Sequence, residues 1–245
     1  MDKLEQFLEW VKESERIVFF GGAGVSTESG IPDFRSVDGL YNQKYSYPPE
    51  MILSHSFFMN NPSEFYRFYR DKILIDGAEP NITHKKLAEL EAAGKLTAVV
   101  TQNIDGLHQK AGSKKVFEVH GTVARNYCTH CHKMFTGDEL KELIDKSPLR
   151  LPECDNCGGL IKPDVVLYEE GLDDEVWAGA TRHIRDADML IVGGTSLVVY
   201  PAAGLINYYR GSKLVLINKS ETPYDHEANL VLHMALGEVF SKVVC

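Results

Sequence analysis

The sequence predicts an α/β fold, in which helices cover both faces of a parallel sheet and a smaller module is inserted. Apolar runs typical of buried strands alternate with helical segments along the chain. A glycine cluster directly follows the first apolar run, as at the mouth of a nucleotide site. Two Cys-x2-Cys pairs, with 22 residues between them, interrupt the alternation and indicate the smaller module.

The composition is that of an ordinary folded protein. The chain has 245 residues, of which 44% are hydrophobic and 25% are charged. The formal net charge of -9 argues against broad binding to the phosphate backbone of nucleic acids. The chain has no signal-peptide pattern and no apolar run of about 18 residues, so we expect a cytoplasmic protein without membrane association. In that reducing compartment, the five cysteines are expected to be metal ligands or free thiols.

The first elements are an amphipathic helix over residues 1–16 and a strand over 17–20. The strand runs into GGAGVSTESGIPDFR at 21–35, which matches a dinucleotide-binding fingerprint only in part. Thr27 stands where the third glycine of that fingerprint is expected, and no acidic residue follows at the usual place. A nicotinamide-dependent dehydrogenase, one alternative, would require both features.

The later elements continue the alternation. Residues 36–80 are rich in Tyr, Phe, Pro and Asn and are expected to form a helical insertion over the glycine loop. A helix with Thr83 as its N-cap and Gly94 at its end precedes a strand at 96–101. The sequence then predicts strands at 116–120 and 164–168, a helix at 173–188, and strands at 189–194 and 213–218.

Polar residues and glycines gather at the ends of the predicted strands or directly after them. These are Gly22, Gln102 to Asp105, His120, Gly194 to Ser196 and Asn218. The carboxyl ends of the strands form the ligand crevice of an open parallel sheet, so we expect these segments to converge. His120 titrates near neutral pH and is followed by Gly121, which allows close backbone approach, so it is a candidate general base. His84 and His108 are instead expected on helix or loop surfaces.

The paired cysteines predict one structural zinc site. The ligands would be Cys128, Cys131, Cys154 and Cys157. Four thiolates complete a tetrahedral site and leave no position for a catalytic water, with free thiols as the alternative. His130 and His132 are expected to be exposed rather than ligands, and Cys245 has no partner at suitable spacing. A zinc ribbon could also belong to a nucleic-acid-binding module, but the charges of this segment balance.

These motifs together resemble those of the sirtuin family of NAD-dependent protein lysine deacylases, in particular its compact bacterial and archaeal members. The motifs are GAGVSTESGIPDFR at 22–35, TQNIDGLH at 101–108, HG at 120–121, the cysteine pairs and GTSLVVYPA at 194–202. Their order and spacing match over nearly the whole chain. The resemblance implies a Rossmann-like domain over 1–35, 81–125 and 164–245, a helical insertion at 36–80 and a zinc-ribbon insertion at 126–163.

The resemblance also implies roles for single residues. The implied NAD contacts are Gly22, Ala23, Gly24, Thr27, Asp33, Phe34, Arg35, Gln102, Asn103, Ile104, Asp105, His120, Gly194, Thr195, Ser196 and Asn218. The implied contacts of the acyl-lysine substrate are Val165, Val166, Tyr168, Leu197 and Val198. His120 would be the general base, and Asn103 would be the second catalytic residue.

The implied reaction consumes NAD as a co-substrate. Nicotinamide leaves, the acyl oxygen attacks the ribose C1', and His120 deprotonates a ribose hydroxyl that attacks the resulting imidate. Water then releases free lysine and an O-acyl-ADP-ribose. An ADP-ribosyltransferase shares the first step and is an alternative, whereas a zinc-ribbon binding protein without catalysis would leave the glycine loop unexplained.

Two places depart from the family pattern. Glu169 replaces the glycine of a Phe-Gly-Glu stretch with which the substrate peptide pairs as an added strand. We hypothesise that Glu169 and Glu170 favour peptides with basic flanks. Tyr69 and Lys72 stand where members that prefer succinyl or malonyl lysine have Tyr-x-x-Arg, and lysine lacks the two-pronged grip of arginine. Deacetylation is therefore expected, with desuccinylation or demalonylation as the alternative.

Overall fold

The expected parallel sheet is present and has six strands. The computed structural model describes residues 2–34, 39–40 and 45–244. The strands are β1 (Ile17–Gly21), β2 (Leu96–Thr101), β3 (Val116–Glu118), β7 (Met189–Gly193), β8 (Leu214–Ile217) and β9 (Leu230–Leu232). They pair in parallel in the order β3-β2-β1-β7-β8-β9. Strands are thus added outward on both sides of β1, as in doubly wound dinucleotide-binding sheets.

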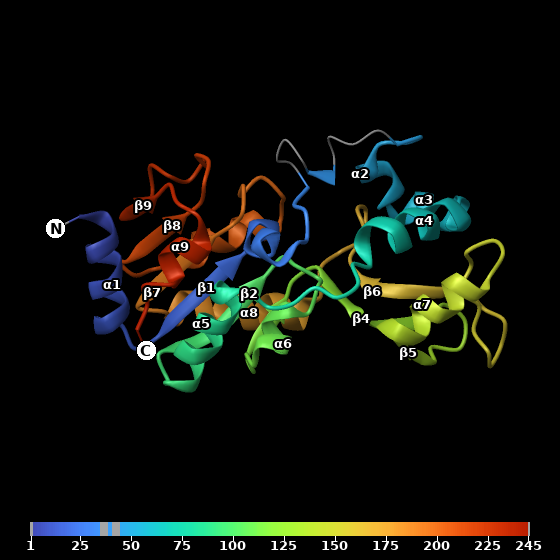
Figure 1. Ribbon diagram of the computed structural model, residues 1–245, viewed down its shortest axis with the longest axis horizontal. Coiled ribbons are helices and arrows are strands. Elements are labelled where there is room, and N and C mark those ends of the chain that lie inside the picture. Colours follow the sequence, from blue (N-terminus) through green and yellow to red (C-terminus); the bar gives the residue numbers. More distant parts are fainter. Residues whose placement is uncertain (1, 35–38, 41–44, 245) are drawn as a thin grey trace.

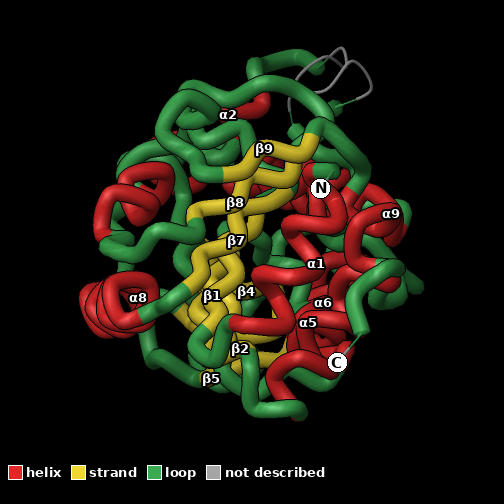
Figure 2. Tube along the Cα trace, turned by 90° about the vertical axis from the view of Figure 1, so that its left-hand side faces the viewer, coloured by secondary structure: helices red, strands yellow, loops and turns green. Residues whose placement is uncertain are grey.

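Helices cover both faces of this sheet (Figure 2). One face is covered by α1 (Lys3–Glu13), α5 (Ile82–Ala92), α6 (Leu107–Ala111) and α9 (Leu236–Phe240), the other by α8 (Asp174–Asp186) and the 3-10 helix η5 (Ala202–Tyr208). Successive side chains of a strand point to opposite faces, so Phe19 lies in one core and Phe20 in the other. Both are fully buried, which explains the uninterrupted apolar run of β1. Within the described residues, no helix is both long and apolar enough to cross a membrane.

The N-cap of α5 is Asn81, so the prediction of Thr83 was wrong. The side chain of Asn81 accepts hydrogen bonds from the backbone N–H groups of Thr83 and His84 at 3.0 and 3.4 Å. Asparagine caps helices at least as well as threonine, and here it also donates to the carbonyl oxygen of Val25 at 2.8 Å. That second bond, which links α5 to the glycine loop, has no signature in the local sequence. Gly94 follows the helix as expected.

The smaller module contains a three-stranded antiparallel sheet of order β5-β4-β6. Its elements are β4 (Gly121–Cys128), β5 (Met134–Thr136), α7 (Gly137–Lys146) and β6 (Ile161–Val165). The strand expected at 164–168 was therefore wrong in its bounds and its sheet. The segment 161–165 alternates buried and half-buried residues and includes a proline, which suits a small sheet with one solvated face.

The insertion after the glycine loop is helical, as expected, and packs on this small sheet. It contains α2 (Pro49–Ile52), α3 (His55–Asn60), α4 (Pro62–Phe68) and a π-helical turn, η4 (Tyr69–Ile73). Figure 1 shows the insertion and the small sheet together at one end of the molecule, and the parallel sheet at the other. One hydrophobic core joins them, in which Phe58 and Tyr66 of the insertion meet Leu140 of α7.

Candidate active site and metal centre

The loops that follow β1 and β7 meet where the strand order reverses. The backbone N–H of Gly24 donates to the carbonyl oxygen of Gly194 at 2.8 Å. A Cβ atom on Gly24 would lie 2.8 Å from Gly194 Cα, and one on Gly22 would lie 2.8 Å from Cβ of Thr195. Glycine is thus required because the first loop touches the backbone of Gly194 and the side chain of Thr195. This reversal point is where open α/β sheets bind ligands.

The side chain of Ser26 joins the glycine loop to the segment after β2. Its Oγ donates to Oδ2 of Asp105 at 2.6 Å and accepts from Nδ2 of Asn103 at 3.1 Å. Asp105 also accepts from the backbone N–H of Leu107 at 2.9 Å. Ser26 is 1% exposed and Asn103 is 9% exposed. The hydrogen bonds therefore satisfy two polar side chains that are buried. Ser26 was not among the predicted site residues, although it lies within the glycine loop at 21–35.

Gln102 connects the ends of three strands. Its backbone N–H donates to Gly21 of β1 at 2.9 Å, and its side-chain Nε2 donates to Oγ1 of Thr195, after β7, at 3.0 Å. Oγ1 of Thr195 in turn accepts from the backbone N–H of Leu197 at 3.2 Å. The segments that were expected to converge from β1, β2 and β7 are therefore brought together.

His120 lies two residues beyond the end of β3, with its ring against the same segment. Its Nδ1 lies 3.1 Å from the carbonyl oxygen of Gln102. A carbonyl only accepts, so Nδ1 carries the proton of the neutral ring and Nε2 keeps a free electron pair. Burial lowers the pKa of His120, and the hydrogen bond to Gln102 raises it, with a net shift below 6.5. The imidazole is therefore neutral at pH 7 and can accept a proton at Nε2.

The strand β6 ends beside His120. The carbonyl oxygen of His120 accepts from the backbone N–H of Val166 at 2.9 Å, and Gly121 pairs with Val165. Gly121 has a φ of +77°, and a Cβ atom there would lie 2.1 Å from the carbonyl oxygen of Asp164. The predicted close approach at Gly121 is thus made by the backbone of β6. It places the two valines of the expected substrate wall next to the candidate base.

The other residues of the first loop that were expected to contact NAD are partly accessible. Ala23 belongs to the 3-10 turn η1 (Ala23–Val25), and Thr27 to the next turn, η2 (Thr27–Ser29). Asp33 and Phe34 follow, and all four are half-buried. Arg35 lies outside the described residues.

The remaining expected contacts lie after the other strands. Ile104 accepts a backbone hydrogen bond from Val123 at 2.9 Å, which ties the segment after β2 to β4. Ser196 is exposed directly after β7. Asn218 is half-buried directly after β8, where its Nδ2 donates to the carbonyl oxygen of Ser220 at 2.8 Å.

The expected substrate residues divide into accessible and buried ones. Tyr168 is 39% exposed and Val198 is 48% exposed. Leu197 is only 1% exposed, because its side chain packs in the core on the α8 face of the sheet. An exposed surface for a ligand is therefore available at Tyr168 and Val198 but not at Leu197.

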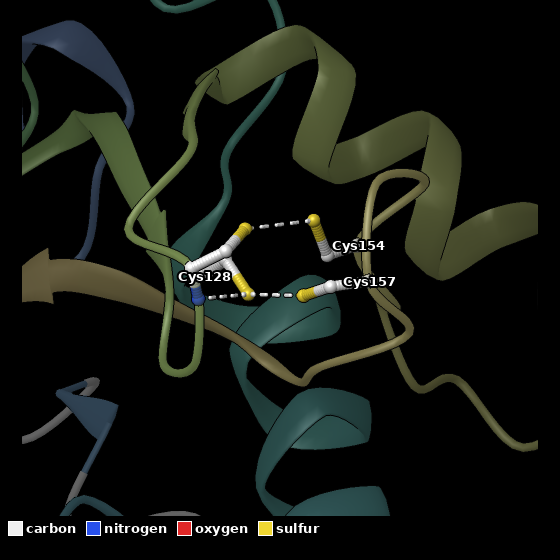
Figure 3. A group of neighbouring side chains, drawn as sticks. Cys128, Cys154 and Cys157 are labelled. Carbon is white, nitrogen blue, oxygen red and sulfur yellow. Dashed lines mark hydrogen bonds between the residues drawn. The ribbon is translucent and has the colours of Figure 1, made fainter.

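The four paired cysteines form one cluster with the geometry of a metal site. Figure 3 labels three of them, Cys128, Cys154 and Cys157. All four Sγ atoms lie within 4.8 Å of one another. The Sγ atoms of Cys128 and Cys157 are 3.4 Å apart, and those of Cys131 and Cys154 are 3.6 Å apart. Sulfurs bound to a tetrahedral zinc at about 2.3 Å would be about 3.8 Å apart, so the cluster fits one zinc ion. The neighbouring His130 and His132 are exposed and outside the cluster, as expected.

Tyr69, the tyrosine that bears on acyl preference, points into the core. Tyr69 is fully buried between the insertion and the zinc-ribbon sheet. The Nζ of Lys72 lies 5.8 Å from the ring centroid of Tyr45.

The expectation that His84 and His108 lie on the surface was wrong. They are 0% and 1% exposed, and their ring centroids are 4.7 Å apart between α5 and α6. Sequence periodicity did not reveal this because imidazole rings can fill a core between two helices. Burial, together with the neighbouring His84, lowers the pKa of His108 to about 3. Burial likewise lowers the pKa of His84, against the opposing effect of Asp105.

These histidines predict a loss of stability in mild acid. The unfolded chain binds their protons near pH 6.5, whereas the folded chain does not until far lower pH. The free energy of unfolding should therefore fall as the pH drops below 6.5, by about 1.4 kcal/mol per pH unit for each histidine. Urea titrations between pH 7.5 and 4.5 measure this slope. The variant His108→Gln should reduce this slope by about 1.4 kcal/mol per pH unit, which corresponds to one proton. An unchanged slope would contradict the attribution of the slope to these histidines.

Comparisons with known proteins agree with this geometry. The Sir2 family model matches residues 22–201. The chain is 57% identical over 246 residues to the NAD-dependent protein deacetylase of Clostridium acetobutylicum, covering 100% of this chain and 99% of that protein. It is 47% identical over 243 residues to the NAD-dependent protein deacetylase of Staphylococcus aureus (strain N315), covering 98% of each.

Solved structures give the same result at the level of the fold. A structure described as "Sir2-p53 peptide-NAD+" superposes with a TM-score of 0.87 at 42% identity, covering 98% of this chain and 97% of that one. Another, "Sir2 bound to acetylated peptide", has a TM-score of 0.88 at 41% identity with the same coverage. The likeness therefore includes both the parallel sheet and the smaller module.

Proposed function

The chain belongs to the Sir2 family, the sirtuins, and from this premise we propose that it removes acetyl groups from protein lysine side chains with NAD as co-substrate. It is an NAD-dependent protein deacetylase, like the relatives that it matches over their full length. The observation that carries the assignment is the position of His120, beside the loops that meet at the reversal point of the sheet. Its Nδ1 is held by the carbonyl oxygen of Gln102, which leaves Nε2 to accept a proton.

The residues of the three loops fit the two halves of NAD. We propose that the loop 22–35 holds the diphosphate and the adjoining ribose, and that Ser196 and Asn218 hold the adenosine half. Asn103 and Asp105, fixed by Ser26, supply a buried amide and a half-buried carboxylate of the kind that can recognise the nicotinamide carboxamide. When bound, NAD supplies the ADP-ribose that accepts the acyl group, with release of nicotinamide.

The chemical work of the protein is to orient groups and to move one proton. Nε2 of His120 accepts the proton of a ribose hydroxyl, and the Nδ1 bond to Gln102 holds the ring in the tautomer that allows this. Asn103 is proposed as the second catalytic residue, acting in the nicotinamide pocket. Because Asn103 and Ser26 are buried, the electrostatic effect of this amide is stronger than it would be in solution.

The substrate is proposed to lie along the exposed edge beside β6. Val165 and Val166 would form the apolar wall around the acyl-lysine, and Tyr168 and Val198 would contact the peptide. Their position next to His120 supports this placement. We leave Leu197 out of the groove because its side chain packs in the core on the α8 face of the sheet, whereas Val165, although buried, lies beside His120. A cytoplasmic location and the absence of nucleic-acid and membrane partners stay predictions.

We propose the domain division that the sequence indicated. The large domain comprises 1–35, 81–125 and 164–245, and the smaller module comprises 36–80 and 126–163. The boundaries at 125 and 163 fall inside β4 and β6, so the small sheet extends across them. The distribution of buried side chains supports this division, because two cores flank the parallel sheet and a third joins the helical insertion to the zinc-ribbon insertion. The zinc ion would hold the smaller module together, and its full set of thiolates leaves no ligand position for chemistry.

The direct test mixes the protein with NAD and either an acetyl-lysine or a succinyl-lysine peptide. We expect one nicotinamide and one O-acetyl-ADP-ribose for each lysine freed. The succinyl peptide should have a kcat/KM at least about tenfold lower, because Lys72 offers no bidentate grip on its carboxylate. No NAD-dependent product with either peptide would refute the function, and label from NAD retained on protein would favour an ADP-ribosyltransferase.

A further inference from the structure

The segment that follows β6, residues 167–170, is bonded to the helical insertion. The backbone N–H of Tyr168 donates to the carbonyl oxygen of Leu53 at 3.0 Å, and the carbonyl oxygen of Tyr168 accepts from the N–H of His55 at 3.0 Å. We call residues 167–170 the substrate loop, because the proposed function places the peptide beside them. Two backbone bonds thus join this loop to the start of α3.

Glu169 adds a side-chain tie at the same place. Its Oε2 accepts from the backbone N–H of Ser56 at 2.8 Å, and its Oε1 accepts from Oγ of Ser56 at 2.9 Å. Ser56 lies in the first turn of α3, where backbone N–H groups have no partner within the helix. Both carboxylate oxygens of Glu169 are therefore used by one residue of the insertion.

The backbone of Glu169 makes this arrangement unusual. Its φ of +78° lies in the left-handed region, which glycine adopts freely and other residues seldom adopt. A glutamate at this position carries a conformational cost, and the two bonds to Ser56 are the interactions that offset it. A glycine would adopt the same backbone but could not make them.

The neighbouring Glu170 is also engaged within the chain. Its Oε1 lies 2.8 Å from Nδ1 of His55, and its Oε2 lies 3.1 Å from Nζ of Lys162. Burial raises the pKa of Glu170, but the N–H of Leu167, His55 and Lys162 together lower it by more than burial raises it. The net shift is therefore downward. Since both glutamates are bound by groups of this chain, their placement does not favour the hypothesis that they select basic flanks.

We infer that Glu169 is a positioning residue that ties the substrate loop to α3 and so orders the edge on which the acyl-lysine peptide binds. The inference rests on the proposed function for the identity of its substrate. An edge that is ordered beforehand reduces the conformational entropy that peptide binding would otherwise lose. Because the peptide backbone binds alike before and during the reaction, the effect falls on the peptide KM rather than on kcat.

The test compares two substitutions of Glu169, one double variant and one control variant with the wild-type enzyme. Glu169→Gly should raise the peptide KM about threefold to tenfold, the range for losing hydrogen bonds to a partly exposed charge, with kcat and the KM for NAD within about twofold. Glu169→Gln keeps one acceptor and should lie between this variant and the wild type. Ser56→Ala should add nothing to Glu169→Gly in the double variant. Glu9→Gln, on α1, removes an equal charge elsewhere and should change no parameter.

Hydrogen exchange supplies a second measurement that does not depend on activity. The amides of Tyr168 and His55 should exchange at least about threefold faster in Glu169→Gly, because both backbone bonds lie beside the lost tie. The inference would be overturned by unchanged exchange or by an unchanged peptide KM. It would also be overturned if kcat fell and the KM for NAD rose as much as the peptide KM. Absence of deacetylation by the wild type would refute the proposed function instead, and exchange would still test the tie.

Discussion

Replacing His120 by Tyr should lower kcat/KM for NAD-dependent deacetylation by at least about a hundredfold while the zinc stays bound. General bases contribute on the order of 10² to 10⁴ in rate, and a phenol that titrates near pH 10 cannot accept a proton at neutral pH. His120→Asn is the more conservative change, because its amide can still donate to Gln102 but cannot act as a base. Steady-state rates with an acetyl-lysine peptide measure both variants.

The pH profile gives an independent check on His120. Its pKa lies below 6.5, so the basic form is lost only as the pH falls beneath that value. The acid limb of kcat/KM should therefore lie below pH 6.5 in the wild type and be absent from the residual activity of His120→Asn. His226→Tyr, at an exposed histidine, is the matched control and should keep wild-type rates. Near-normal activity in His120→Tyr would show that another group is the base.

Removal of the zinc ion should unfold the smaller module and abolish activity. Structural zinc sites contribute on the order of 10 kcal/mol to folding, which is comparable to the whole stability of a typical domain. Cys128 and Cys154 are buried in the core that also contains Phe58 and Tyr66, so the damage should spread from the zinc ribbon into the helical insertion. Circular dichroism, zinc content and deacetylation should fall together in Cys128→Ser or after chelation.

The identity of the metal distinguishes a structural from a catalytic role. If the four thiolates only hold the fold, cobalt in place of zinc should restore deacetylation to within about twofold. A rate that changes strongly with the metal would contradict the structural assignment. Cys245→Ser, which removes a cysteine outside the two pairs, should retain zinc, fold and activity.

The sequence by itself determined those features that neighbours along the chain encode. Strands buried on both faces are continuous apolar runs, so β1, β2, β7 and β8 could be predicted from short windows. The zinc ligands could also be predicted from short windows, because each Cys-x2-Cys pair brings two thiolates to one ion. The convergence of the loops followed from one topological rule, that the carboxyl ends of parallel strands share an edge.

Only the tertiary structure decided which polar side chains meet. Ser26 bonds to a carboxylate 79 residues away, and Glu169 bonds to a serine 113 residues away. Such partners leave no pattern in the local sequence. Ser26 was therefore missed, and Glu169 was expected to act on the substrate peptide, whereas its side chain bonds to α3. The burial of His84 and His108 was misjudged for the same reason, since two packed helices create it. Periodicity and spacing are properties of a segment, whereas burial and bonding of a polar group depend on what the fold places against it.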